Sequence, residues 1–134
     1  MRLPTAPFAV LIAMLGCILA PVRASGAADL PPAALAEIHY LLATVGASGC
    51  EFFRNGTWHD AHQAQTHLSE KYQSLLDRGR LRTAEDFIEL AATRSSLTAQ
   101  PYAVRCAGQA PVSSNSWLTG QLRRYRDTAG TPHV

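Results

Sequence analysis

Two cysteines that lie far apart in the chain, Cys50 and Cys106, constrain its fold more than any other feature. Neither belongs to a Cys-x-x-Cys pair, which argues against the alternative of a catalytic or metal-bound thiol. In an oxidising compartment two such cysteines are expected to form a disulfide. The bridge would close a loop of about 56 residues and stabilise the fold by about 4 kcal/mol through the entropy of the unfolded chain.

The start of the chain indicates that it reaches such a compartment. Arg2, an apolar run over residues 8–20 and the small-residue site Val22-Arg23-Ala24 follow one another in the order of a secretory signal peptide. We therefore expect cleavage after Ala24, a periplasmic or secreted protein, and a single domain over residues 25–134. The apolar run has about 13 residues where a membrane-spanning helix needs roughly 20, so no stable membrane span is expected after cleavage.

A third cysteine leaves a second route to the envelope open. Cys17 follows Gly16, as the small residue before a bacterial lipidation cysteine requires, but Met14 and Leu15 fit that pattern poorly. A lipoprotein anchored at Cys17 is therefore the less favoured reading. The favoured one treats Cys17 as one more apolar residue of the signal peptide.

The charge of the mature chain argues against nucleic acid as a partner. The full sequence has 12 basic and 10 acidic residues, and cleavage would remove Arg2 and Arg23 but no acid. The exported chain would then carry no net charge, which does not suit general binding to a phosphate backbone. The basic run Arg123, Arg124 and Arg126 is expected to be a solvated helix end.

Four short helices are expected. The first opens at Pro31-Pro32, presents Leu35, Ile38, Leu42 and Val45 on one face, and ends at Gly46 and Gly49. The second runs from about Asp60 to Asp77, the third begins after Thr83, and the fourth covers about Ser116 to Arg126. Asp60 and Thr83 are the residue types that cap helix N-termini.

A β-hairpin is expected between the first two helices. Phe52 and Phe53 precede Asn55-Gly56, and Thr57-Trp58 follow it, which is the strongest short-range hairpin pattern. The segment from Gln100 to Cys106 reads as extended, because a proline at position 101 disfavours helix before it. The predicted fold is thus mainly α, with about four short helices, a small β-hairpin and one disulfide.

Three polar side chains could form an anion site. His67 and Lys71 are four residues apart on the second helix and therefore neighbours on its surface. Lys71 is the only lysine of the sequence. Arg54, just before the hairpin turn, could join them in binding a carboxylate or phosphate. The alternatives are that Lys71 pairs with a nearby acid and that Arg54 pairs with Glu85 or Asp86.

No catalytic or metal-binding signature accompanies these residues. His59, His62 and His67 are badly spaced for zinc, since positions 62 and 67 point to different sides of a helix, and no H-E-x-x-H pattern is present. The serine-nucleophile elbow, the phosphate loop and the dinucleotide fingerprint are also absent. We therefore expect neither a metal nor a cofactor.

An ordered series of short motifs resembles a known family. The series is Phe52-Phe53-Arg54-Asn55-Gly56, Ala64-x-x-His67-Leu68-x-x-Lys71, Thr83-Ala84-Glu85-Asp86-Phe87-Ile88, and Ser95-Ser96 with Pro101-Tyr102-x-Val104. Together they resemble the YfeK-like family of small exported bacterial proteins, a family of unknown function. That family often has glycine shortly before the Pro-Tyr step, where this chain has Ala99, which argues against a left-handed turn at this point.

The resemblance implies export and a compact domain but no reaction. It directs attention to the polar positions of the shared pattern, which are Arg54, Asn55, His67, Lys71, Glu85 and Tyr102. Our leading hypothesis is a non-catalytic envelope module that binds a small anionic ligand or an envelope protein, with Tyr102 as a wall of the site. One alternative is a structural or assembly factor in which Arg54, Glu85 and Lys71 satisfy one another. The other is a small hydrolase or lyase with His67 as general base, Glu85 orienting it and Arg54 stabilising charge.

Overall fold

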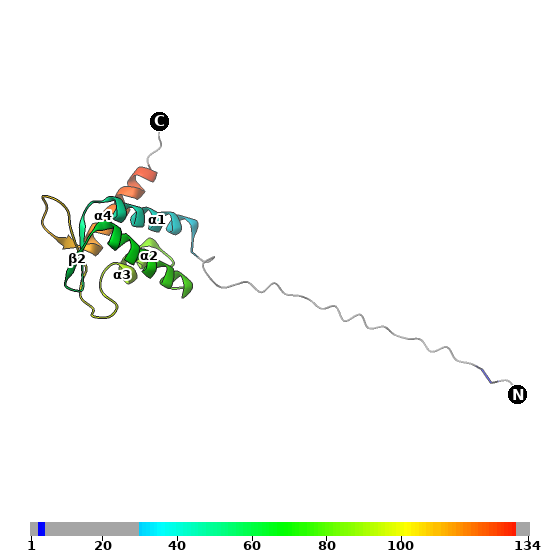
Figure 1. The fold of residues 1–134 in the computed structure, drawn as a ribbon. Helices are drawn as coiled ribbons and strands as arrows, with labels where there is room; N and C mark the ends of the chain where they lie inside the picture. The colour runs from blue at the N-terminus through cyan, green and yellow to red at the C-terminus, as the bar shows by residue number, and fades with distance from the viewer. Residues whose placement is uncertain (1–2, 5–29, 131–134) are drawn as a thin grey trace.

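The computed structural model describes residues 3–4 and 30–130 and shows a helical domain with a small sheet (Figure 1). The expected signal-peptide cleavage site at Ala24 and the lipidation candidate Cys17 lie outside the described residues. The elements are, in chain order, α1 (Pro32–Ala47), β1 (Glu51–Arg54), β2 (Thr57–His59), α2 (Ala61–Asp77), α3 (Ala84–Ala91), β3 (Ala103–Arg105), β4 (Val112–Ser113) and α4 (Ser114–Ala129). The prediction of a mainly α fold with four helices is confirmed for this part of the chain.

The helices form because their apolar residues recur on one side. In α2 the predicted stripe is buried throughout, and so is the inner face of α3; their buried residues are Ala61, Ala64, Leu68, Tyr72, Leu75, Ala84, Phe87, Ile88 and Ala91. In α1 the prediction was wrong at one position, since Leu35 is exposed while Ala34 and Leu41 are buried beside Ile38. Burial of these faces against one another supplies most of the stability of the domain.

The starts of α2 and α3 are fixed by local hydrogen bonds, as expected. Asp60 accepts from the Gln63 backbone N–H at 2.8 Å, and the Gln63 side chain accepts from the Asp60 N–H. Thr83 and Asp86 form the same reciprocal arrangement at the start of α3. The end of α1 differs from the prediction, because Gly46 lies inside the helix, where a side chain would collide with that of Gln65 on α2. Gly49, with φ of +65°, follows the helix end as predicted.

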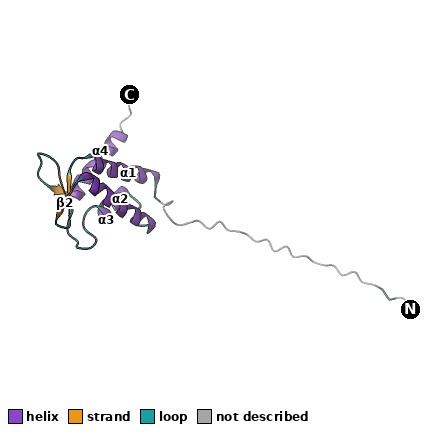
Figure 2. Ribbon diagram, in the orientation of Figure 1, coloured by secondary structure: helices purple, strands orange, loops and turns teal. Residues whose placement is uncertain are grey.

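The sheet is larger than the predicted hairpin. Its strand order is β2-β1-β3-β4, antiparallel throughout, and Figure 2 shows it to one side of the helices. The hairpin turns at Asn55 and Gly56, both with positive φ (+50° and +83°), as the Asn-Gly pair requires. The predicted extended segment becomes β3, which pairs Val104 with Phe52 of β1. The two-residue strand β4 was not predicted.

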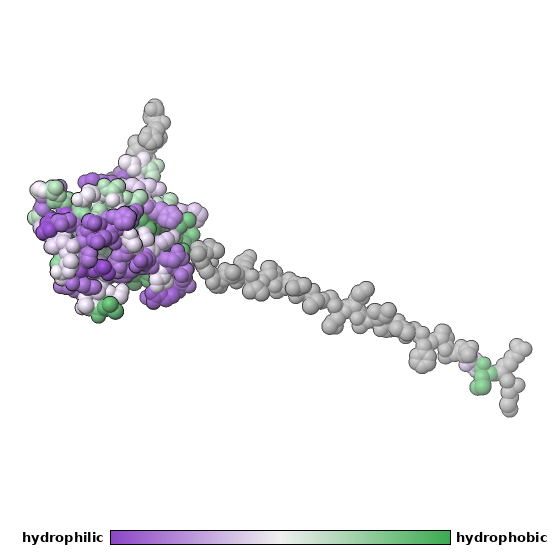
Figure 3. Space-filling view, viewed as in Figure 1, coloured by the Kyte–Doolittle hydropathy of each residue, from purple (hydrophilic) through white to green (hydrophobic). Residues whose placement is uncertain are grey.

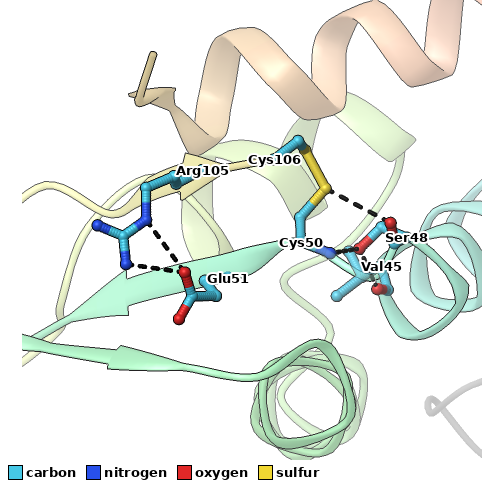
Figure 4. The surroundings of a disulfide bond; sticks show 6 residues. All are labelled: Val45, Ser48, Cys50, Glu51, Arg105 and Cys106. Atoms are coloured by element: carbon cyan, nitrogen blue, oxygen red, sulfur yellow. Dashed lines mark hydrogen bonds and ion pairs between the residues drawn. A yellow bond between two sulfur atoms is a disulfide. The ribbon is translucent and has the colours of Figure 1, made fainter. Parts of the chain in front are cut away.

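The disulfide joins the two central strands of this sheet at one end. Figure 4 shows Cys50, just before β1, bonded to Cys106, just after β3, with their Cα atoms 4.4 Å apart. Next to it Arg105 donates to the Glu51 carboxylate at 2.7 Å across the same strand pair. The predicted disulfide is confirmed, and it fits a protein that matures outside the cytoplasm. None of the helices in the described part of the chain has the length and apolar character needed to cross a membrane.

An ordered loop connects α3 to β3 and contacts the hairpin turn. Ser95 accepts at its hydroxyl from the N–H groups of Leu97 and Thr98, and the Thr98 hydroxyl donates to the Asn55 side chain at 3.0 Å. Ala99 has φ of +59°, so the left-handed turn that its side chain argued against is present. These contacts hold the loop, although Leu97 itself is almost fully exposed.

The face of the domain drawn in Figure 3 is mostly polar. On this face, hydrophilic residues predominate and the hydrophobic ones are scattered. Arg126 of α4 ties the helices together on the surface by pairing with Glu37 of α1 at 2.8 Å and with Glu85 of α3 at 2.6 Å. It is thus not the purely solvated helix end that the sequence predicted.

Candidate functional site

Three of the predicted site residues come together between β1 and α2. Arg54, the last residue of β1, points its Nη1 at Nδ1 of His67 with 3.2 Å between the two nitrogens. Lys71 lies one helical turn beyond His67 on α2, as their spacing predicted. We call Arg54, His67 and Lys71 the cationic cluster. It would have been excluded as a shared site if Arg54 and Lys71 had been far apart and fully solvated, but both are only partly exposed.

Tyr102 closes one side of the cluster, in the position expected for a wall. Its hydroxyl lies 3.5 Å from the Lys71 ammonium, which also lies 5.2 Å from the centre of its ring. The ring of His67 meets the Tyr102 ring edge to face at 6.3 Å. A second bond of Lys71, at 3.5 Å, goes to the backbone carbonyl of Arg94 in the loop after α3. Lys71 is therefore oriented by the loop and by Tyr102.

The cluster holds two positive charges that no described acid neutralises. Neither Arg54 nor Lys71 forms an ion pair with any residue from 30 to 130. The expectation that Lys71 pairs with an acid is therefore wrong for the described chain, and so is the pairing of Arg54 with Glu85 or Asp86. Glu85 binds Arg126, and Asp86 accepts from the backbone at the start of α3.

Burial and mutual repulsion shift the pKa values of these groups. Burial, followed by the nearby charges of Arg54 and Lys71, lowers the pKa of His67 below its ordinary value of 6.5. Burial, and then Arg54, likewise lowers the pKa of Lys71. Burial raises the pKa of Tyr102. His67 is therefore neutral at neutral pH, and the charge of the cluster comes from Arg54 and Lys71.

The contact with Arg54 determines which nitrogen of the neutral imidazole carries the proton. A guanidinium can only donate, so Nδ1 of His67 must accept, and the hydrogen lies on Nε2. Nε2 is fully buried and has no hydrogen-bond partner in the described structure. A buried N–H without an acceptor costs about 1–3 kcal/mol. The site thus contains a donor that is ready for an oxygen atom.

A small cavity adjoins the cluster. Its volume is about 30 Å³, enough for one or two water molecules or ligand oxygens, since one water needs about 10–15 Å³. Apolar side chains from β1, α2 and α4 form part of its wall. The polar residues that line it are Arg54, His59, Gln63, His67, Tyr102 and Ser114. A cavity of this size admits the end of a ligand and leaves the remainder outside.

Three predicted site residues do not line this cavity. Lys71 contacts Tyr102, which lines the cavity, but does not line it itself. Asn55 holds the hairpin turn and binds Thr98, so its role is to connect the turn to the neighbouring loop. Glu85 is on the surface of α3 in its pair with Arg126. Because Glu85 does not face His67, it cannot orient the imidazole as the hydrolase hypothesis requires. The structural hypothesis requires Arg54, Glu85 and Lys71 to pair with one another, and they do not.

Three polar residues of the cavity were not among the predicted site residues. His59 was set aside with the badly spaced histidines, yet it pairs with Phe52 across the hairpin and so lies on the same face of the sheet. The alternation of β2 could have shown this. Gln63 and Ser114 could not have been found in this way, because their places depend on how α2 and α4 pack. Across the described residues, no three His, Cys, Asp or Glu side chains gather where a metal could be held.

Comparison with known proteins gives a family but no activity. A model of a family of unknown function, DUF5329, matches residues 32–126. The uncharacterised protein YfeK of Salmonella typhimurium is 43% identical over 51 residues, which make up 38% of this chain and 41% of YfeK. The match thus spans less than half of that relative. No solved structure matches the chain.

Proposed function

Because the chain belongs to DUF5329, a family of unknown function that supplies no activity to carry over, we propose a function from its own geometry. The protein is a non-catalytic binding module of the cell envelope. It holds the anionic end of a small ligand, or of an envelope partner, at the cationic cluster. The observation that carries this proposal is the buried Nε2–H of His67 beside two cations that lack acids.

The chemistry of the cluster favours an oxygen anion. Arg54, Lys71 and the Nε2–H of His67 are all donors, and an arginine fork and a lysine ammonium both suit carboxylate or phosphate oxygens. One oxygen in the cavity of about 30 Å³ would give Nε2 the acceptor it lacks. It would also lessen the repulsion by Arg54, which after burial is the second cause of the lowered pKa of Lys71.

The location follows from the sequence and agrees with the disulfide. A chain with a signal peptide cleaved after Ala24 would fold in the periplasm or outside the cell, where Cys50 and Cys106 can be oxidised. Lipidation at Cys17 is the alternative. Mass spectrometry of the exported protein separates the two, since a chain that begins at Ser25 retains no lipid.

The anion site is tested by titrating the oxidised, exported protein with acetate and with inorganic phosphate. The readout is the NMR signal of the His67 ring nitrogens, which reports the tautomer and the new acceptor at Nε2. We expect a saturable shift of Nε2 and a higher melting temperature with at least one of the two anions. Lys71→Gln should weaken binding at least tenfold, and Lys71→Arg should restore part of it.

A matched control uses a cation outside the cluster. Arg78 lies at the end of α2 and is exposed, and within the described chain its side chain bonds only to Ser74 of the same helix. Arg78→Gln should therefore leave binding unchanged. If neither anion moves the His67 signal, or if Arg78→Gln weakens binding as much as Lys71→Gln, the cluster is not an anion site. That result would favour a structural role in the envelope.

A further inference from the structure

A larger depression lies over the disulfide, at the end of the sheet where α1 stops. Its volume is about 540 Å³, within the range of small-ligand sites. The C-terminal end of α1, the turn after Cys106 and one side of α4 line it, and we call it the disulfide groove. It shares no lining residue with the cavity at the cationic cluster, so a ligand in the groove is independent of the proposed function.

The groove presents polar groups that the fold leaves unused. The side chains of Gln109, Gln121 and Arg124 line it, and none of them makes a hydrogen bond or an ion pair within the described chain. Trp117 lines it as well, half-buried, with its ring packed edge to face against Phe52 at 5.7 Å. No acidic side chain lines the groove. The groups that the groove offers to a ligand are therefore two free carboxamides, one indole and one cation.

This inventory matches the chemistry of a sugar better than that of other ligands. A carboxamide both donates and accepts, as the hydroxyl and acetamido groups of a sugar do. An indole offers a flat apolar surface for the C–H face of a pyranose ring, together with an N–H donor. One guanidinium can pair with one carboxylate. None of the residues lining the groove belongs to a strand, so no sheet edge is offered to a peptide backbone.

We infer that the disulfide groove is a second binding site, which takes a short N-acetylated saccharide carrying one carboxylate. Trp117 stacks on the ring, Gln109 and Gln121 bond its hydroxyl or acetamido groups, and Arg124 binds the carboxylate. A peptide or an uncharged glycan would use only part of these groups.

The binding test uses Trp117 as its own reporter. The chain has two tryptophans, and Trp58 lies away from the groove, against Phe53 and under the guanidinium of Arg105. Trp58→Phe therefore leaves Trp117 as the only fluorescent indole. The probes are N-acetylmuramic acid, which carries a carboxylate, and N-acetylglucosamine, which has the same ring without it. We expect a saturable fluorescence change with both sugars, and a dissociation constant at least tenfold lower for the acidic one.

Two neighbouring arginines of α4 provide a matched pair of variants. Arg124→Gln should abolish the preference for the acidic sugar. Arg123→Gln should leave that preference unchanged, because Arg123 lines a different depression with Glu85 and Arg126. Calorimetric titration of the unaltered protein checks that the substitution of Trp58 does not create the result.

A third variant separates binding from folding. Gly120 lines the groove, and a Cβ atom added there meets no atom within 4 Å. Gly120→Leu should fill the groove, raise the dissociation constants of both sugars at least tenfold and keep the helical signal of α4. The inference is overturned if neither sugar changes Trp117 fluorescence, if Arg124→Gln keeps the preference, or if Gly120→Leu binds as tightly as the parent.

Discussion

His67 is kept neutral by its surroundings, and this makes the stability of the domain depend on pH. Its folded pKa is lowered, so below about pH 6.5 the unfolded chain takes up a proton that the folded chain resists. The free energy of unfolding should therefore fall as the pH drops from 7.5 to 5.5. Urea unfolding at the two values measures this, and His67→Gln should reduce the difference.

The comparison with His67→Gln isolates one group among several that face it. Arg54 and Lys71 lower the pKa of His67, Glu70 raises it, and His59 lowers it slightly. Both proteins retain those neighbours, so the difference between their pH profiles belongs to residue 67. Parallel profiles for the two proteins would mean that His67 is not held neutral.

Ala99 adopts a conformation that glycine adopts without strain. Its φ of +59° costs an alanine about 1–2 kcal/mol in the folded state, and glycine would remove this cost. Glycine also makes the unfolded chain more flexible, which offsets part of the stabilisation. Ala99→Gly should therefore raise the free energy of unfolding by up to about 1 kcal/mol. Ala43→Gly, in the exposed middle of α1, is the matched control and should lower it by about 1 kcal/mol. Chemical denaturation of both variants decides whether the loop is strained, and an equal loss in both would contradict it.

Among the helices, α4 contains one residue that lowers its stability. Gly120 lies in the middle of α4, and a methyl group there would touch nothing. Gly120→Ala should stabilise the protein by about 0.5–1 kcal/mol, because alanine loses less backbone freedom in a helix. Thermal unfolding should show a rise of several degrees. Gly56→Ala makes the same chemical change at φ of +83° and should destabilise the hairpin instead. A fall with Gly120→Ala would show that α4 needs the glycine.

The helices, their caps and the hairpin turn could be predicted from the sequence, but which strands pair with one another could not. Capping at Asp60 and Thr83 and the turn at Asn55-Gly56 depend on residues only a few positions apart, so the pattern determines them. The disulfide was predicted from the expected export and from the two cysteines that would remain after cleavage of the signal peptide. The pairing of β1 with β3 joins segments about fifty residues apart, and periodicity carries no information about it.

The same limit explains the outcome for the site. The spacing of His67 and Lys71 placed them on one helix flank, which is a local property. The partner of Arg54 was misjudged, because a helical pattern shows which face Glu85 occupies but not which element covers it. The cavity itself is lined by β1, β2, α2, α4 and the segment between α3 and β3. The places of Gln63 and Ser114 therefore depend on how distant elements pack, and only His59 had a local signal, the alternation of β2.

For the whole domain, the disulfide is a large single contribution to stability, and its Cys50 belongs to the buried core. Its loop of 56 residues corresponds to about 4 kcal/mol by the chain-entropy model, out of the 5–15 kcal/mol typical of a domain. We expect the Cys50→Ser, Cys106→Ser protein to unfold at a markedly lower urea concentration. Adding reductant to the parent should reproduce this, whereas the double variant should not respond to reductant. Equal midpoints for parent and double variant would contradict the estimate.

The position of this bond also bears on how the protein matures in the cell. Cys50 and Cys106 flank the two middle strands, and every other strand adds to one of these two. A chain exported as proposed above must therefore acquire the bond from a thiol oxidant before its sheet is secure, and until then it is exposed to proteases. The amount of this protein that accumulates should then follow the oxidising capacity of its compartment, independently of any ligand that it binds.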